Sequence, residues 1–154
     1  MSEPPQPHPA KYLRREMDDF AREFYRRLAE EGQLCTTRCD GCGRASFPPR
    51  ARCPVCGREE RWIELPKHGR LFAFTTQEAA LRFRAPATLA LAEIGEVLVP
   101  GVVDVPYESL RIGQEVEVAL RPERETGLTL LAFEPSRARR RGPPRQKGSA
   151  QQRS

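Results

Sequence analysis

Two short cysteine pairs constrain the fold of this chain more than any other feature. Each pair has the spacing C-x-x-C, and ten residues separate the two pairs. The four residues are Cys39, Cys42, Cys53 and Cys56. Paired hooks of this kind are typical of one tetrahedral metal ion in a small ribbon, and four sulfur ligands favour zinc over magnesium or calcium. We therefore predict a rubredoxin-like zinc ribbon with these four cysteines as the ligands.

The predicted metal is structural, because four cysteines close the tetrahedron and leave no position for water or substrate. Three other uses of the cysteines remain open: two redox-active pairs, a disulfide framework, or an iron centre of the rubredoxin kind. A deaminase-type zinc site would also need a His-x-Glu element, and neither His8 nor His68 is followed by one.

The fifth cysteine, Cys35, stands outside both hooks. We expect it to be an apolar or semi-exposed residue on the strand that enters the ribbon. A redox or ligand-exchange role is the alternative, although only Arg38 lies close enough in sequence to lower its pKa.

The positive charge of the chain is concentrated near its C-terminus. Its 154 residues include 26 basic and 21 acidic residues, a formal net charge of +5 at pH 7. Seven basic residues lie between Arg137 and Arg153 without an acidic one, so the remaining 19 basic and 21 acidic residues give −2. We expect a near-neutral folded body, a disordered basic tail over residues 136–154 and a flexible Pro-rich lead-in over residues 1–10.

Neither a signal peptide nor an apolar run of about 18 residues is recognisable in the sequence. A cytoplasmic protein is the expectation, because thiols stay reduced there and can hold a metal ion.

Before the first hook, apolar side chains recur at spacings of three and four residues. They are Leu13, Met17, Phe20, Phe24 and Leu28. This period predicts an amphipathic helix over residues 11–32, with Gly32 as the stop. The apolar stripe either covers the protein's own core or docks onto a partner protein.

After the ribbon, predicted over residues 33–66, short apolar runs alternate with turn residues. The runs cover residues 69–77, 87–94, 97–105, 115–120 and 128–133. Five strands of this length suggest a small closed barrel, so we predict an OB-fold over residues 67–135. The expected fold class is mainly β with an N-terminal α-helix, a zinc ribbon and a five-stranded barrel.

Further motifs surround the hooks and give the chain a recognisable order of parts. They are Arg38-Cys39-Asp40-Gly41-Cys42-Gly43, Phe47-Pro48-Pro49-Arg50, Cys53-Pro54-Val55-Cys56, Trp62, Gly69-Arg70-Leu71, Phe74-Thr75, Pro86 and Leu110-Arg111-Ile112-Gly113. Over residues 20–135 this order resembles the zinc-ribbon OB-fold, acyl-CoA-associated protein family. Members of that family are accessory subunits of thiolase-like enzymes, and some are fused or paired with hot-dog hydratases.

The resemblance implies a non-catalytic subunit of a thiolase-type acyl-CoA C-acyltransferase complex. The helix and ribbon would bind the catalytic subunit, and the barrel would help to form or gate the acyl-CoA entrance. The nucleophilic cysteine of the Claisen-type reaction would lie on the partner, in a hetero-oligomer with two copies of each chain. The residues agree, since neither histidine has a recognisable catalytic partner and no Gly-rich loop precedes a helix.

One loop departs from the family's commoner pattern and carries candidate contacts to a coenzyme A thioester at the partner interface. Arg82, Phe83 and Arg84 could offer two cations to the phosphates and a ring to stack on adenine. A solvated loop with one anchoring phenylalanine is the alternative. The same two interpretations, a phosphate contact or a solvated surface, apply to three arginines around the ribbon: Arg44, Arg50 and Arg52.

A single-stranded nucleic-acid binder is the alternative function, because zinc ribbons and OB barrels both serve that purpose and the tail is basic. Phe72 and Phe74 could stack on bases, but the predicted strands have no cationic stripe. A structural adaptor that touches no ligand is a third possibility.

Overall fold

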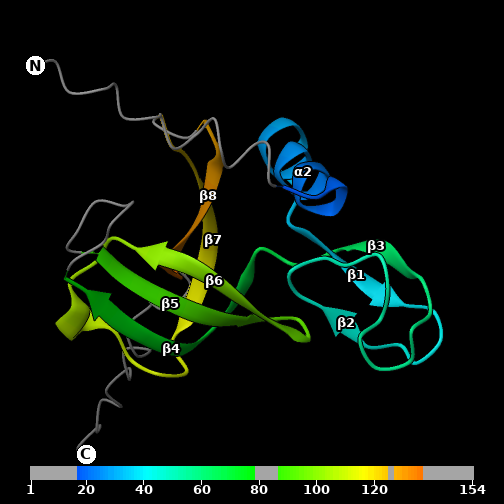
Figure 1. Ribbon diagram of the computed structural model, residues 1–154. Coiled ribbons are helices and arrows are strands. Elements are labelled where there is room, and N and C mark those ends of the chain that lie inside the picture. The colour runs from blue at the N-terminus through cyan, green and yellow to red at the C-terminus, as the bar shows by residue number, and fades with distance from the viewer. Residues whose placement is uncertain (1–16, 79–86, 125–126, 137–154) are drawn as a thin grey trace, which may run out of the picture.

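Two β structures and one helix make up the protein. The computed structural model describes residues 17–78, 87–124 and 127–136. A three-stranded sheet has the order β2-β1-β3, and a closed barrel has the order β4-β5-β6-β8-β7. Figure 1 shows the sheet and the barrel side by side, with helix α2 next to the sheet. The predicted fold class is confirmed.

Helix α2 (Asp19–Arg26) begins later than the sequence pattern predicts. The side chain of Asp18 accepts a hydrogen bond of 2.7 Å from the N–H of Ala21 and so caps the helix. Met17 and Asp18 are therefore not helical, and the earlier part of the predicted helix lies outside the described residues. After α2 the backbone widens into a π-helical turn, η1 (Arg27–Glu31), which ends at Gly32 with φ at 62°.

The apolar side of the helix packs against the protein itself. Phe20 stacks on Trp62 with ring centroids 5.5 Å apart, and Phe24 meets Phe47 edge-on at 5.8 Å. Phe24 and Leu28 are buried. The sequence left open whether this stripe covers the chain's own core or docks onto a partner. The structure places Phe24 and Leu28 in the chain's own core.

The small sheet carries the cysteine hooks at its end. It comprises β1 (Cys35–Cys39), β2 (Ala45–Ser46) and β3 (Glu60–Glu64), with β1 antiparallel to both neighbours. Thr37 of β1 lies opposite Ser46 and Trp62. The first hook begins at the last residue of β1, and the second hook precedes β3. The pairing of β1 with β3 therefore brings the two hooks together.

The barrel follows the predicted strands closely. It is formed by β4 (His68–Gln77), β5 (Ala87–Ile94), β6 (Val97–Val103), β7 (Glu115–Pro122) and β8 (Thr129–Pro135). A short parallel pairing of β6 with β8 and the pairing of β7 with β4 close it, and a 3-10 turn, η2 (Tyr107–Ser109), precedes β7. This is the strand order of an OB-fold.

One apolar cluster continues from the helix through the ribbon into the barrel. Its buried members include Phe24, Leu28, Leu34, Leu65, Leu71, Ile94, Val99 and Phe133. The N–H of Leu65 donates to the carbonyl of Leu34 at 2.7 Å, and Arg38 of the ribbon pairs with Glu96 on the β5–β6 hairpin at 2.9 Å. Figure 1 shows that hairpin reaching toward the small sheet. Ribbon and barrel are therefore packed on each other.

Phe133 fills the centre of the barrel because Gly101 leaves room for it. A Cβ at position 101 would lie 2.7 Å from the ring of Phe133 and 3.0 Å from the carbonyl oxygen of Leu131. Any larger residue at this position of β6 would displace the ring.

None of the helices in the described part of the chain has the length and apolar character that crossing a membrane requires.

Candidate metal centre

The first hook is a tight turn closed by two backbone hydrogen bonds. The N–H of Gly43 donates to the carbonyl of Cys39, and the N–H of Cys39 donates to the carbonyl of Arg44, each at 3.0 Å. Gly43 has φ at 73°, a left-handed conformation that glycine adopts without steric cost.

The second hook repeats this turn. Gly57 donates to the carbonyl of Cys53 at 2.9 Å, and Cys53 donates to the carbonyl of Arg58 at 2.8 Å. Gly57 also has φ at 73°. The repeated sequence C-x-x-C-G-R thus folds twice into one conformation. The hooks differ at their third position, where the first has Gly41 and the second has Val55.

The four sulfur atoms lie at the corners of a site that suits one tetrahedral ion. The Sγ atoms of Cys39 and Cys56 are 3.3 Å apart, those of Cys42 and Cys53 are 3.6 Å apart, and all four lie within 4.8 Å of one another. Four sulfurs about 2.3 Å from a zinc ion would be separated by about 3.8 Å. The cluster therefore fits a structural zinc ion, with no fifth protein ligand needed.

Backbone N–H groups favour the thiolate form of the first cysteine of each hook. The N–H groups of Gly41 and Cys42 point at the Sγ of Cys39, at 3.3 and 3.4 Å. The bond from Cys42 contributes most and lowers the pKa of Cys39 to about 7. The N–H of Cys56 likewise lowers the pKa of Cys53. Metal binding requires thiolates, so the turn prepares these two ligands.

The second cysteine of each hook faces solvent. Cys39 and Cys53 are 1% and 3% exposed, whereas Cys42 and Cys56 are exposed. The N–H of Arg58 lowers the pKa of Cys56, but its bond with Cys39, burial and the other thiols raise that pKa to about 11. Four thiols this close cannot all ionise without a cation among them, which is the condition that a bound metal ion satisfies.

A buried carboxylate joins the three ribbon strands beneath the hooks. Glu60 is 8% exposed and accepts hydrogen bonds from the hydroxyls of Thr37, at 2.6 Å, and Ser46, at 2.8 Å. Thr37 also accepts a 2.8 Å bond from the N–H of Arg50. The sequence does not predict this role, because Glu59 and Glu60 are adjacent and only the register of β3 decides which one points inward.

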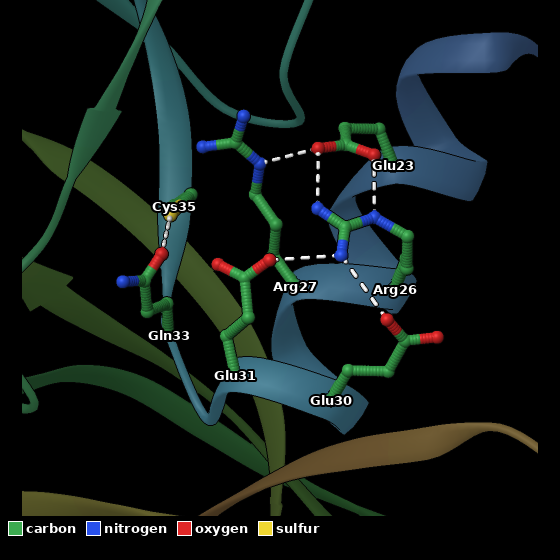
Figure 2. A network of polar contacts seen from close by, with 7 residues as sticks. All are labelled: Glu23, Arg26, Arg27, Glu30, Glu31, Gln33 and Cys35. Atoms are coloured by element: carbon green, nitrogen blue, oxygen red, sulfur yellow. Dashed lines mark hydrogen bonds and ion pairs between the residues drawn. The ribbon is translucent and has the colours of Figure 1, made fainter.

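Cys35 lies outside the metal cluster, as the first residue of β1, which confirms its predicted position. It is buried, and burial raises the pKa of its thiol. Its Sγ approaches the Oε1 of Gln33 at 3.8 Å. Figure 2 shows Cys35 beside a surface network in which Arg26 meets Glu23, Glu30 and Glu31.

The candidate coenzyme A contacts Arg82, Phe83 and Arg84 lie outside the described residues. The strand ends on either side of them border an open hollow of about 390 Å³. Its lining includes Thr76, Thr88, Tyr107 and two carboxylates, Glu78 and Glu108. Carboxylates do not attract phosphate groups, so the described wall of this hollow offers no phosphate site.

Fold and site together define a protein that joins a four-cysteine zinc ribbon to an OB-fold barrel. Residues 26–60 match the family described as "ChsH2, rubredoxin-like zinc ribbon domain", and residues 62–121 match "ChsH2, C-terminal OB-fold domain". A "DUF35 domain-containing scaffold protein" of Methanocaldococcus jannaschii is 31% identical over 124 residues, 76% of this chain and 86% of that protein. The chain belongs to the ChsH2/DUF35 family.

Other proteins are similar to this chain in sequence or in fold. A "DUF35 domain-containing scaffold protein" of Pyrococcus furiosus is 29% identical over 119 residues, covering 71% of this chain and 87% of that protein. A chain of the solved "Ltp2-ChsH2(DUF35) aldolase" superposes with a TM-score of 0.65 at 22% identity, covering 78% of this chain and 97% of that one. A DUF35 protein of Sulfolobus solfataricus gives a TM-score of 0.54 at 16% identity, covering 71% and 84%.

Proposed function

We propose that this chain is a non-catalytic scaffold subunit of a thiolase-like acyl-CoA enzyme complex. The observation that carries the proposal is membership of a family whose similar members include scaffold proteins. Further support comes from the fold that this chain shares with a chain of the Ltp2-ChsH2(DUF35) aldolase. The catalytic nucleophile would then belong to the partner, and this chain would supply positioning and complex stability.

Zinc in this proposal is structural and held by Cys39, Cys42, Cys53 and Cys56. A bound zinc ion would cross-link the two hooks, and the binding free energy would stabilise the folded ribbon. A reducing compartment such as the cytoplasm keeps the thiols available for this role.

The outer face of the barrel is the surface that we assign to the catalytic subunit. Phe72, Leu89, Leu91 and Leu98 are exposed there on three adjacent strands. Leu89 lies opposite Thr75 and Leu91 opposite Ala73, while an irregularity of β4 places Phe72 outward with 53% of its surface exposed. Exposed apolar side chains gathered in this way mark interaction surfaces.

This assignment moves the docking surface away from the apolar side of the helix, because Phe24 and Leu28 are already buried in the chain's own core. The acyl-CoA thioester would lie near the interface, where Arg82, Phe83 and Arg84 could meet its phosphates and adenine. A complex with two copies of each chain completes the proposal.

The test is affinity capture of the tagged full chain from its native cell extract, with mass spectrometry of the captured proteins and a nuclease-treated control. We expect a thiolase-like subunit in stoichiometric amount, unaffected by nuclease. Leu91→Asp should abolish its capture, because the carboxylate would be buried unpaired in an apolar interface. Arg124→Asp, which puts the same group on the exposed β7–β8 connection, should leave capture unchanged.

Capture of nucleic acid, with all partners lost on nuclease treatment, would contradict the scaffold role and favour the alternative function. Equal capture by Leu91→Asp and the unaltered chain would contradict the assigned surface but not the scaffold role.

A further inference from the structure

Besides the four sulfurs, the side chain of Arg58 also brings the two hooks into contact. A Cβ placed on Gly41 of the first hook would lie 2.4 Å from the Cδ of Arg58, 3.2 Å from its Nε and 3.3 Å from its Nη1. Arg58 follows the second hook in sequence, and its side chain lies beside Gly41 of the first.

Gly41 is needed for the space it leaves and not for its backbone conformation. It is absent from the glycines with positive φ, unlike Gly43 in the same hook. A glycine in an ordinary conformation can be replaced by alanine without backbone strain. The three atoms nearest to an added methyl group all belong to Arg58.

The second hook has no glycine at the position that corresponds to Gly41. Arg44 occupies the same place after the first hook that Arg58 occupies after the second, but the third position of the second hook is Val55. The side chain of Val55 is 60% exposed and fills the place that Gly41 leaves empty. The two turns thus share a backbone conformation but differ in the residue at the third position.

The charge of Arg58 suits this location. Within the described part of the chain it has no carboxylate partner within ion-pair distance, whereas Arg61 of the same ribbon pairs with Asp40 at 2.6 Å. Four thiolates around one divalent cation leave a formal charge of −2, which a guanidinium nearby offsets. Gly41, over which Arg58 lies, donates its N–H to the Sγ of Cys39.

We propose that Arg58 is a positioning residue that closes the metal centre. It holds the first hook against the second and places a positive charge beside the thiolates. It therefore slows metal loss and shields the exposed sulfurs of Cys42 and Cys56. This role concerns the ribbon alone and does not depend on the scaffold proposal.

The test measures zinc release from the zinc-loaded full chain under excess chelator, followed with a chromogenic zinc indicator. Arg58→Ala should release zinc about two to five times faster, the range expected for an exposed charge interaction. Arg58→Lys should fall between Arg58→Ala and the unaltered chain. Arg44→Ala is the matched control and should release zinc at the unaltered rate, because the second hook has Val55 where the first has Gly41.

Gly41→Ala displaces Arg58 without deleting it and separates the contact from any general effect of losing an arginine. We expect it to release zinc as fast as Arg58→Ala, and the double variant to be no faster than either, because both changes remove one interaction. Alkylation of Cys42 and Cys56 by iodoacetamide, mapped by mass spectrometry, should accelerate in the same variants, while buried Cys35 stays unchanged.

Equal release rates for Arg58→Ala and Arg44→Ala would overturn the proposal, and so would an unaltered rate in Gly41→Ala. Additive effects in the double variant would also contradict it, since they would mean that the two residues act separately.

Discussion

Different interactions stabilise the ribbon and the barrel. Inside the ribbon, the buried side chains are mainly thiols, hydroxyls and one carboxylate: Cys35, Thr36, Thr37, Cys39, Ser46, Cys53 and Glu60. Inside the barrel they are apolar, with Phe133 at the centre. A segment of about 40 residues or fewer cannot bury enough apolar surface to offset its chain entropy. A zinc ion bound by the four cysteines would stabilise the ribbon as the apolar core stabilises the barrel.

The ribbon also has apolar side chains at its base, where it packs against the barrel. Leu34 and Leu65 belong to the same apolar cluster as the barrel residues Ile94 and Val97. The barrel should therefore stabilise the base of the ribbon, whereas the tip that carries the hooks should depend on a bound metal ion.

Replacing one metal ligand should have the largest effect on the ribbon and leave the barrel folded. Cys53→Ser removes a buried ligand, and structural zinc is worth about 10 to 16 kcal/mol in small zinc-finger peptides at pH 7. We expect loss of zinc, measured by elemental analysis, and loss of amide protection in β1 to β3. Protection should persist in the barrel. Cys35→Ser is the control and should keep its zinc.

Removing the central barrel side chain should have the next largest effect. Phe133→Ala creates a cavity in the core and should lower the free energy of unfolding by about 3 to 5 kcal/mol, measured by denaturant titration. The zinc content should stay at one ion per chain. Simultaneous loss of zinc would mean that the barrel, and not the metal, determines whether the ribbon folds.

The polar core of the ribbon offers a smaller test. Thr37→Val keeps the shape of the side chain but removes the hydroxyl that donates to Glu60. The free energy of unfolding should fall by about 1 to 3 kcal/mol, because a buried acceptor loses a partner. Thr75→Val on the exposed barrel surface should change it by less than about 0.5 kcal/mol. Equal effects at the two sites would show that the buried hydroxyl is dispensable.

The helix start should give the smallest effect. Asp18→Ala removes the cap on the N–H of Ala21 and should cost about 1 kcal/mol, visible as a lower midpoint in thermal unfolding followed by circular dichroism. Asp19→Ala changes an exposed residue one position later and should have a weaker effect. A stronger effect at position 19 would place the cap elsewhere.

The barrel strands and the hooks were predictable because their patterns are local. Alternation such as Glu115-Val116-Glu117-Val118 marks a half-buried strand, and the predicted and observed ends of β5 coincide. The spacing of the cysteines alone indicated the cluster that the structure brings within 4.8 Å. Repetition of Gly and Arg after each hook was visible in the sequence and could have predicted the repeated turn.

Features that depend on contacts between distant segments could not be read in the same way. The apolar stripe of the helix did not reveal its own partners, because Trp62 follows Phe20, and Phe47 follows Phe24, by more than twenty residues. Nothing local distinguishes Glu60 from Glu59, or Arg58 from the other arginines of the ribbon. These assignments depend on the register of β3 and on how the two hooks face each other.

Native mass spectrometry of the affinity-captured complex tests the scaffold role most directly. The account predicts one assembly that contains a thiolase-like subunit and this chain in equal numbers, with the mass of one zinc ion for each copy of this chain. Finding this chain alone, or bound only to nucleic acid, would contradict it.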